Sequence, residues 1–355
     1  MKKKVVNMFF YQSETYQSDL KLAATSIVNV ENLYGKTVLV TGASGMIGSF
    51  IVDTLVYLNQ HFQASIRIVA LGRNQESLLT RFQGHDDQIS YLLQDVSAPL
   101  AYTGNIDFII HAASNANPKS YSSDPVGTIS ANLSGTENLL QVSQKTGAKF
   151  IYISTGEVYG ELDDAYLPFS EEMAGYIDPM NVRSCYSLSK KMAENLCIAY
   201  SSQYGVNTII ARLSHVFGAN FTAKDNRVSA AFFRDALSGD KIILKSKGQH
   251  LRSYTYLSDC VAGILSITSQ GASGEAYNVT KTDNAITMAD FAKTVANIAG
   301  VDFEFQISEI EVAQKTPISK AVLSDEKLKG IGFLPTVSVA SGVKRILDTL
   351  REVNK

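Results

Sequence analysis

Tyr186 and Lys190 have the types and the spacing of an acid–base pair. They are four residues apart in a stretch with helical periodicity, so both side chains lie on one face of the expected helix. A tyrosine is a poor base near its ordinary pKa of about 10, but a neighbouring lysine cation favours the phenolate and lowers that pKa. The pair therefore predicts a residue that removes a proton from a bound molecule.

A strand-like segment earlier in the chain ends in further polar groups. The run Ile151-Tyr-Ile-Ser-Thr-Gly-Glu-Val-Tyr-Gly160 begins as a buried strand and ends in hydroxyl groups and a carboxylate. Thr155 and Glu157 would lie at the edge of a sheet, where the helix that carries Tyr186 can meet them. We predict that Tyr186 and Lys190 act together with polar groups at the end of this strand.

A glycine-rich turn near the start of the chain predicts a dinucleotide site. The run Thr41-Gly-Ala-Ser-Gly-Met-Ile-Gly48 follows an apolar strand, Lys36 to Val40, and precedes helical periodicity from Ser49 to Asn59. This order is typical of the first strand, turn and helix of a dinucleotide-binding domain. The spacing is G-x-x-G-x-x-G rather than G-x-G-x-x-G.

The three glycines of this turn have separate steric tasks. Gly42 and Gly45 let the turn fold back and let its backbone approach a pyrophosphate, and Gly48 lets the helix pack close to the strand. The start of the helix, which includes Met46 and Ile47, offers free N–H groups and a positive dipole to the phosphates.

The elements that must position these residues follow an alternating pattern. Nearly continuous apolar runs, which indicate strands buried on both faces, alternate with helical stretches. The runs are Val38–Thr41, Ile66–Leu71, Ile89–Leu93, Phe108–His111, Phe150–Ser154 and Thr208–Leu213, and the longest helical stretches are Thr128–Thr146 and Tyr186–Tyr204. The pattern predicts the α/β class: a doubly wound parallel sheet of Rossmann type with a smaller C-terminal substrate-binding domain.

The alternation starts and stops at points that suggest domain boundaries. A helix-like piece, Ser18 to Val28, precedes the first strand, and from Phe217 onward the alternation breaks down, with a helix near Met288–Ala299 followed by Phe303–Ile310. We expect an N-terminal extension that packs on the domain or on a partner subunit. The expected parts are an extension at 1–34, a dinucleotide-binding domain at 35–212 plus about 253–280, and a substrate-binding domain at about 213–252 plus 281–355.

Composition excludes several classes of function. The 355-residue chain is 45% hydrophobic and has a formal charge of −2 with both signs interspersed, which argues against nucleic acid and membrane surfaces as partners. No apolar run approaches the roughly 18 residues of a membrane span. Three cysteines without a C-x-x-C motif indicate neither a disulfide scaffold nor a metal site. We expect a cytoplasmic protein.

The motifs together resemble the extended short-chain dehydrogenase/reductases of the nucleotide-sugar epimerase/dehydratase group. The matching pieces, besides those above, are Asp95-Val96, His111-Ala-Ala-Ser114 and Asn132-Leu-Ser-Gly-Thr136. Within that group, further stretches resemble UDP-glucuronate decarboxylases: Asn181-Val-Arg-Ser-Cys-Tyr186, Lys191-Met-Ala-Glu-Asn-Leu-Cys197, Asp225-Asn-Arg-Val228 and Gly248-Gln-His-Leu-Arg-Ser253.

The resemblance implies chemistry through a 4-keto sugar. Tyr186 would take the proton of the sugar 4-hydroxyl while a nicotinamide takes the hydride from C4, and Lys190 would tune Tyr186 and hold the ribose. Thr155 would hydrogen-bond the 4-oxygen, and Glu157 matches the active-site glutamate of the group. The 4-keto group then lets a 5-carboxylate leave as carbon dioxide before the hydride returns.

The motifs and the resemblance also imply binding residues. Those expected to bind the cofactor are Gly42, Gly45, Met46, Ile47, Gly48, Arg73, Asn74, Asp95, Val96, His111, Ala112, Ala113, Ser114, Asn132, Tyr186 and Lys190. Those expected to bind the substrate are Ser114, Asn115, Thr155, Arg183, His215, Asn220, Arg227 and Arg252. Arg252 and Arg227 are candidates because a guanidinium group matches the geometry of carboxylates and phosphates.

Two departures from the group leave the reaction open. Gly156 stands where decarboxylases and 4,6-dehydratases carry Ser or Asp, and His215 stands where the group usually has an asparagine near the diphosphate. A decarboxylase-like reaction ranks first, ahead of a 4-epimerase and an NADPH-dependent 4-keto reductase. The alternative to an enzyme is a non-catalytic, regulatory dinucleotide-binding protein.

The end of the second strand bears on the cofactor. NAD enzymes of this fold keep an acid there for the ribose 2′-hydroxyl, whereas this chain has Gly72-Arg73. Arg73 can pair with a 2′-phosphate, so the cofactor is NAD or NADP, with Arg73 favouring NADP. We also expect a homodimer through a four-helix interface, because Thr128–Thr146 and the helix from Tyr186 carry apolar residues on more than one face.

Overall fold

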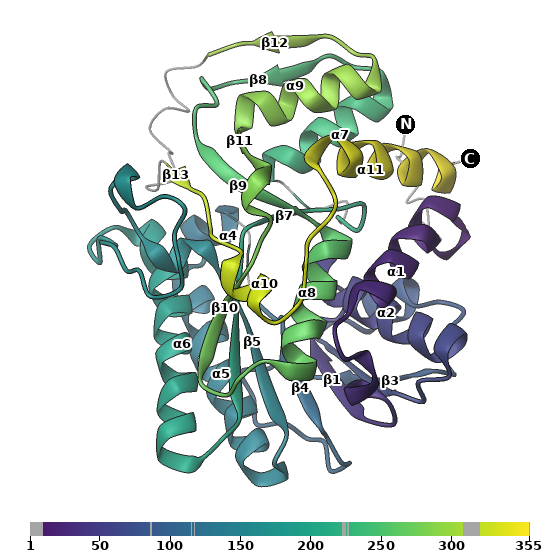
Figure 1. Cartoon of the computed structure of the whole chain (residues 1–355), viewed down its shortest axis with the longest axis vertical. Helices are drawn as coiled ribbons and strands as arrows, with labels where there is room; N and C mark the ends of the chain where they lie inside the picture. Colours follow the sequence, from purple (N-terminus) through teal and green to yellow (C-terminus); the bar gives the residue numbers. More distant parts are fainter. Residues whose placement is uncertain are drawn as a thin grey trace.

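A seven-stranded parallel sheet forms the centre of the protein (Figure 1). The computed structural model describes residues 10–85, 87–114, 116, 118–221, 225, 227–307 and 320–354. The strand order is β10-β6-β5-β4-β1-β2-β3, which matches the doubly wound arrangement that the sequence predicts. The strands are β1 (Thr37–Thr41), β2 (Arg67–Gly72), β3 (Ile89–Leu93), β4 (Phe108–His111), β5 (Lys149–Thr155), β6 (Thr208–Leu213) and β10 (Glu275–Val279).

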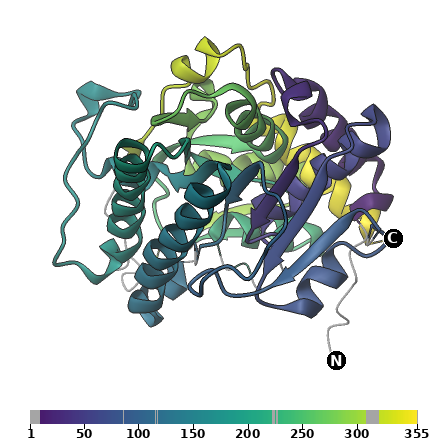
Figure 2. The ribbon, with the colours of Figure 1, turned by 90° about the horizontal axis from the view of Figure 1, so that it is seen from below.

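Helices cover both faces of this sheet. Alternate residues of β1 show why: Val38 and Val40 join the apolar core beneath α2 and α8, whereas Leu39 joins the core beneath α5 and α6. Figure 2 shows α5 and α6 side by side at one side of the sheet. The helices of these layers are α2 (Met46–Phe62), α3 (Gln75–Arg81), α5 (Pro125–Thr146), α6 (Cys185–Tyr204) and α8 (Leu257–Gln270), with the short α4 (Pro118–Ser123) before α5.

A smaller lobe lies beyond the carboxyl ends of the central strands. The chain passes directly from β6 into β7, which pairs with β9 in a second sheet of order β11-β9-β13. The lobe contains β7 (His215–Phe217), β8 (Ile242–Leu244), β9 (Leu251–Tyr256), β11 (Ala285–Thr287), β12 (Phe303–Phe305), β13 (Lys320–Ala321), α7 (Val228–Ser238), α9 (Met288–Ala299) and α11 (Val339–Val353). The short α10 (Glu326–Gly330) instead packs beside β10 of the central sheet (Figure 1). Of the expected element Phe303–Ile310, residues 308–310 lie outside the described part of the chain.

Short 3₁₀ helices connect the regular elements. They are η1 (Phe10–Gln12), η2 (Val30–Leu33), η3 (Gly156–Tyr159), η4 (Asp164–Tyr166), η5 (Val182–Ser184) and η6 (Thr282–Asn284). Two of them, η3 and η5, carry residues of the candidate site.

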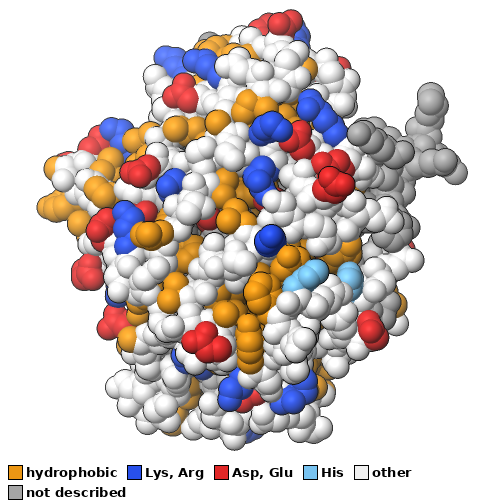
Figure 3. All heavy atoms as spheres, turned by 45° about the vertical axis from the view of Figure 1, so that its right-hand side comes forward, with side chains coloured by type: hydrophobic (Ala, Val, Ile, Leu, Met, Phe, Trp, Pro, Cys, Tyr) orange, Lys and Arg blue, Asp and Glu red, His pale blue; other side chains and the backbone are white. Residues whose placement is uncertain are grey.

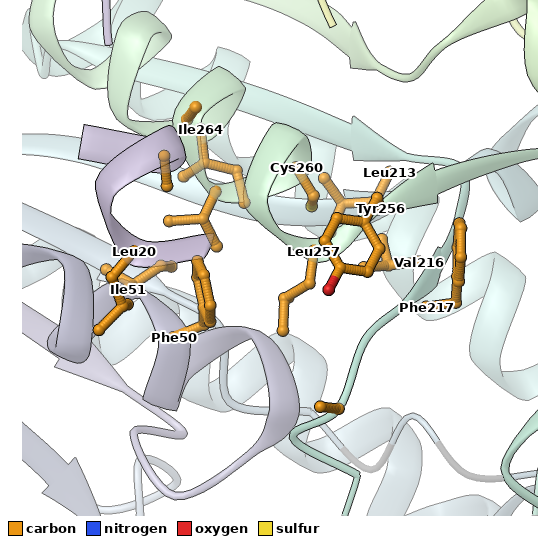
Figure 4. Close-up of a cluster of buried hydrophobic side chains, with 14 of the residues drawn as sticks. Leu20, Phe50, Ile51, Leu213, Val216, Phe217, Tyr256, Leu257, Cys260 and Ile264 are labelled. Atoms are coloured by element: carbon orange, nitrogen blue, oxygen red, sulfur yellow. The ribbon is translucent and has the colours of Figure 1, made fainter. Parts of the chain in front are cut away.

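The N-terminal segment packs across both lobes. Its helix α1 (Glu14–Ser26) begins four residues before the expected Ser18, because the side chain of Ser13 caps it by accepting a hydrogen bond from the Tyr16 amide. Figure 4 shows Leu20 of α1 beside Phe50 and Ile51 of α2, in one core with residues of α8. The hydroxyl of Ser13 also donates to Glu352 of α11 at 2.6 Å.

A buried carboxylate anchors this segment to α2. Asp53, which is fully buried, accepts hydrogen bonds from the hydroxyls of Tyr11 and Tyr16 and pairs with Arg81. Arg81 also donates to the Tyr16 hydroxyl at 2.9 Å. The network joins the N-terminal segment, α2 and α3, and it is compensated only while every partner is present.

We expect Asp53→Asn to lower the free energy of unfolding by about 3–5 kcal/mol, because it leaves the buried Arg81 cation without its anion. Urea denaturation of the two proteins measures the difference. The matched control is Asp164→Asn, in an exposed pair with Lys320, for which a change below about 0.5 kcal/mol is expected. Equal effects of the two substitutions would show that the Asp53 network does not hold the segment.

On the face shown in Figure 3, basic and acidic side chains are interspersed, without a continuous field of either sign. Among the described residues, no helix is both long enough and apolar enough to span a bilayer.

Candidate active site

The glycine-rich turn is closed by tight backbone contacts. Gly42 has a φ of +64°, a conformation that favours glycine, and a Cβ at Gly42 would lie 2.8 Å from the Cα of Ala113. A Cβ on Gly48 would overlap the carbonyl oxygen of Gly42. Gly45 is the N-cap of α2 and has no side chain to cap it. The first N–H groups of α2, including that of Met46, are therefore available to an anion.

His111, at the end of β4, is held against this turn. Its Nδ1 lies 2.8 Å from the hydroxyl of Thr41, which also accepts the Ala113 amide at 3.1 Å. Burial, together with the Lys190 cation, lowers the pKa of His111 to about 3. The imidazole is neutral at physiological pH, and among the described residues its buried Nε2 has no hydrogen-bond partner.

A chain of hydrogen bonds joins α5 to α6 beside His111. Asn132, fully buried in α5, accepts from the Ser114 hydroxyl at 2.8 Å and donates to the Ser189 hydroxyl at 2.9 Å. Ser189 in turn donates to the carbonyl oxygen of Tyr186 at 3.1 Å. Of the predicted neighbours, Ala112 is half-buried, and Asn115 lies outside the described residues.

Tyr186 lies in the first turn of α6 and is buried. Its ring stacks on that of Tyr121, with 4.6 Å between the ring centroids. Burial, with the negative charge of Glu157, raises the pKa of Tyr186, whereas hydrogen bonding to Thr155 opposes that rise. In this state the phenol keeps its proton, so deprotonation needs additional positive charge near the hydroxyl.

Lys190 lies one turn further along α6, as the sequence predicts. Its Nζ donates to the carbonyl oxygen of Ile153 at 2.8 Å and lies 4.7 Å from the centre of the Tyr152 ring. Burial lowers the pKa of Lys190 to about 7. The cation therefore titrates near neutral pH, beside the strand end that carries Thr155.

Glu157 forms an ion pair that the sequence did not reveal. Both of its carboxylate oxygens accept from Arg183, at 3.1 and 3.2 Å, and Oε2 also accepts from the Ser187 hydroxyl at 2.8 Å. The Arg183 guanidinium lies 4.4 Å from the centre of the Tyr121 ring. Tyr121 and Ser187 were absent from the predicted site, because a lone aromatic residue and a helical serine have no distinctive spacing.

The end of β2 carries the predicted cofactor-selecting residues. The side chain of Arg73 is 65% exposed, and its Nη1 lies 3.4 Å from Asp95 Oδ2. A hydrogen bond from the Ser97 amide lowers the pKa of Asp95. Asn74 caps α3, accepting the Ser77 amide at 2.7 Å. Val96 is buried next to α5, where its Cγ2 would lie 2.8 Å from a Cβ on Gly135.

Two predicted substrate residues lie near α2 rather than near Tyr186. The Asn220 amide donates to the hydroxyls of Tyr16 at 2.8 Å and Ser49 at 3.2 Å. Arg227 pairs with Asp225 at 2.6 Å and lies 3.3 Å from the sulfur of Met46. The structure therefore places Arg227 at the start of α2, beside the glycine-rich turn.

The remaining predicted residues come from the smaller lobe. Arg252 of β9 is buried and donates to the carbonyl oxygen of Leu251 at 2.9 Å. Burial lowers its pKa, which the negative charge of Glu157 opposes. His215 of β7 is exposed, and its ring centroid lies 5.7 Å from that of Tyr254.

Gly156, the first departure from the group, packs against the smaller lobe. A Cβ at this position would lie 3.1 Å from Cδ1 of Leu323 and 3.5 Å from the carbonyl oxygen of Leu213. The space beside Gly156 is therefore lined by an apolar side chain.

These observations fit a bound dinucleotide. The glycine cradle would be filled by side chains at Gly42 or Gly48, and the free N–H groups of α2 face the place of a phosphate. Among the described residues no cluster of His, Cys, Asp or Glu could hold a metal ion. The arrangement can bind a dinucleotide beside a tyrosine, a lysine, a threonine and a glutamate.

Comparison with known proteins agrees with this geometry. The model of the NAD dependent epimerase/dehydratase family matches residues 38–280. UDP-glucuronic acid decarboxylase 6 of Arabidopsis thaliana is 31% identical over 318 residues, which cover 88% of each chain. UDP-glucuronic acid decarboxylase 1 of Xenopus tropicalis is 30% identical, covering 89% of this chain and 72% of that protein.

Solved structures show the same fold. UDP-glucose 4-epimerase of Thermotoga maritima, solved with UDP-glucose, has a TM-score of 0.77 at 23% identity, covering 90% of this chain and 100% of that one. A dTDP-glucose 4,6-dehydratase of Bacillus anthracis in complex with NAD has a TM-score of 0.75 at 21% identity, covering 89% and 97%. The family model and the relatives of about 30% identity show that the chain is an enzyme of the NAD-dependent epimerase/dehydratase family.

Proposed function

We propose that the protein decarboxylates a UDP-hexuronate through a 4-keto intermediate, and that its main substrate is UDP-glucuronate. The observation that carries the proposal is the convergence of Thr155, Glu157 and Tyr186 at the end of β5, with Arg183 in the same cluster. Relatives of about 30% identity named as UDP-glucuronic acid decarboxylases support the same substrate.

Each residue has a defined task in this reaction. Tyr186 takes the proton of the 4-hydroxyl, Lys190 supplies the positive charge that favours the phenolate, and Thr155 hydrogen-bonds the 4-oxygen. The glycine-rich turn, Tyr186 and Lys190 would hold the dinucleotide, which would supply reversible hydride transfer at C4. The bond from C5 to the carboxylate then breaks, carbon dioxide leaves, and the electron pair passes to the C4 oxygen beside Tyr186. The enolate then takes up a proton at C5, and Glu157 would carry that proton.

We assign the dinucleotide to residues 35–212 plus about 253–280, and the sugar nucleotide to about 213–252 plus 281–355. The N–H groups of α2 would hold the pyrophosphate, and Asp95 would contact the adenosine. The nicotinamide ribose would lie at Tyr186 and Lys190. Arg227 is assigned to the diphosphate of the substrate, because a guanidinium group matches the geometry of phosphates.

A substitution at Arg73 tests whether the protein prefers NAD or NADP. We expect Arg73→Ala to weaken NADP(H) by about tenfold and NAD(H) much less, because the exposed guanidinium can pair with a 2′-phosphate. Titration of nucleotide fluorescence measures both affinities. The control is Lys344→Ala, which removes an exposed cation on α11. A wild-type protein that binds NAD at least as tightly as NADP would refute this assignment.

A 4-epimerase or a 4-keto reductase is the second candidate, because Gly156 lacks the usual hydroxyl and Leu323 lines its place. Both reactions need Tyr186 and Lys190 but no bond cleavage at C5. Incubation with a panel of UDP-, dTDP-, CDP- and GDP-sugars, followed by product masses, separates the candidates. Decarboxylation removes one carbon dioxide, epimerisation leaves the mass unchanged, and reduction of a supplied 4-keto sugar adds two hydrogens.

The assembly that we propose is a homodimer through α5 and α6. On these adjacent helices Val126 is 72% exposed, Met192 54% and Ile198 39%. Exposed apolar surface of this kind is typical of an interface between subunits. Light scattering at micromolar concentration is expected to give the mass of two chains. Met192→Glu is expected to shift it toward one chain, whereas Leu334→Glu, at an exposed site elsewhere, should not. A wild-type monomer would refute the dimer.

A further inference from the structure

The carboxylate of Glu157 is already occupied in this structure. Arg183 binds both of its oxygens, and the Ser187 hydroxyl donates to one of them. These hydrogen bonds take up acceptor positions on both carboxylate oxygens, so neither oxygen is open to a bound sugar. If Glu157 acts on the proton at C5, some event must loosen its pair with Arg183.

Arg183 is positioned to bind an anion other than Glu157. Its guanidinium stacks on Tyr121 at 4.4 Å, and Tyr121 stacks on Tyr186 at 4.6 Å. The guanidinium is thus separated by one ring from the phenol that meets the sugar C4. The carboxylate of a hexuronate is attached to C5, the carbon next to C4. A planar guanidinium group can donate the same bidentate pair of hydrogen bonds to any carboxylate.

Two guanidinium groups act on the Glu157 carboxylate. Arg183 pairs directly with it, and Arg252 of β9 interacts electrostatically with both Glu157 and Glu161. A hexuronate would bring its own carboxylate to this basic part of the site, whereas a neutral hexose would not.

We propose that Arg183 exchanges Glu157 for the carboxylate of the substrate. Binding of a hexuronate draws the guanidinium from Glu157, which stays hydrogen-bonded to Ser187 and becomes available at C5. A sugar without the carboxylate leaves the pair closed. Arg183 is thereby a specificity-determining residue that links recognition of the acid to the release of Glu157. This inference rests on the proposed function.

The test uses calorimetric titration of UDP-glucuronate and UDP-glucose, which differ at C6 only. All proteins carry Tyr186→Phe, which blocks turnover, and contain saturating dinucleotide. Glu157→Gln is expected to bind UDP-glucuronate about tenfold more tightly, because it removes the resident competitor for Arg183. Arg183→Gln is expected to bind UDP-glucuronate at least about tenfold more weakly and UDP-glucose within about twofold of the parent.

The double variant Arg183→Gln/Glu157→Gln separates exchange from simple neutralisation. If Arg183 binds the substrate carboxylate, the double variant binds UDP-glucuronate at least about tenfold more weakly than Glu157→Gln alone. Equal affinity of these two variants would overturn the exchange, as would a Glu157→Gln protein that binds no more tightly than the parent. Ser187→Ala is the matched control, because it removes a hydrogen bond to Glu157 but no charge, and its affinities should stay within about threefold.

Failure of the inference and failure of the proposed function give different results. If the protein with Tyr186 intact decarboxylates UDP-glucuronate but the Arg183 variants bind both nucleotides alike, only the exchange is overturned. If the parent binds UDP-glucose as tightly as UDP-glucuronate and the protein with Tyr186 intact does not turn over the acid, both fall.

Discussion

Tyr186→Phe is expected to abolish turnover while leaving the fold and dinucleotide binding nearly intact. The substitution removes the phenolic proton carrier and keeps the ring that stacks on Tyr121. General acid–base groups typically supply a factor of about 10²–10⁴ in rate, so a loss of at least about a hundredfold in kcat is expected. The measurement is product formation from the nucleotide sugar, with dinucleotide affinity and thermal unfolding as controls.

A second tyrosine of α6 provides the comparison. Tyr204→Phe also keeps its ring and loses a hydroxyl, but Tyr204 is exposed at the opposite end of the helix from Tyr186. We expect it to retain most of the activity. A Tyr186→Phe protein with more than about a tenth of the parent activity would contradict the assignment of Tyr186.

Glu157→Gln is expected to slow product formation by orders of magnitude while still allowing the first hydride transfer. The amide has nearly the same shape as the carboxylate but lacks its charge and basicity, so only the step at C5 should fail. In a single turnover with UDP-glucuronate, the absorbance of reduced dinucleotide should rise and persist. Stopped-flow absorbance with quenched product analysis measures both steps.

The outcome for Glu157 also decides between the candidate reactions. A 4-epimerase or a 4-keto reductase completes its chemistry at C4, so Glu157→Gln would cost little activity. If Glu157 only shapes the loop through its contacts with Arg183 and Ser187, stability and every activity would fall together, without accumulation of reduced dinucleotide. Arg183→Lys is the control for that case, because it keeps the charge but loses the paired contact.

Much of the fold could be predicted from the sequence because its signals are local. Six of the seven central strands are continuous apolar runs, and the order of strand, glycine turn and helix places the first of them. The seventh, β10, was missed because polar residues interrupt it. Its Asn278 is buried and donates to the carbonyl oxygens of Phe169 at 3.0 Å and Ser324 at 3.1 Å, which are distant in sequence.

Helix boundaries were less predictable than helix positions. The helix expected from Thr128 begins at Pro125, because Asp124 caps it and a proline suits the first turn. Similarly, α2 starts at Met46 rather than Ser49, since the N-cap is Gly45. These ends depend on caps rather than on the apolar period.

The site was predictable where spacing encodes it and unpredictable where side chains meet across elements. A spacing of four residues on a helix brings Tyr186 and Lys190 to one face, and the end of the strand β5 adds Thr155. No local pattern could show that Arg183 would bind both oxygens of Glu157, since that contact joins η5 to η3. Nor could it show that Asn220 would bond Tyr16, because this contact depends on where the N-terminal segment packs.

The fate of the substrate carboxylate tests the central claim most directly. The protein is incubated with NAD or NADP and UDP-glucuronate labelled at its carboxyl carbon, and both the gas and the sugar nucleotide are analysed by mass spectrometry. The proposed function predicts labelled carbon dioxide together with an unlabelled UDP-pentose, formed without net consumption of the dinucleotide. Recovery of the label in an unchanged or epimerised UDP-hexuronate, with no labelled carbon dioxide, would contradict it.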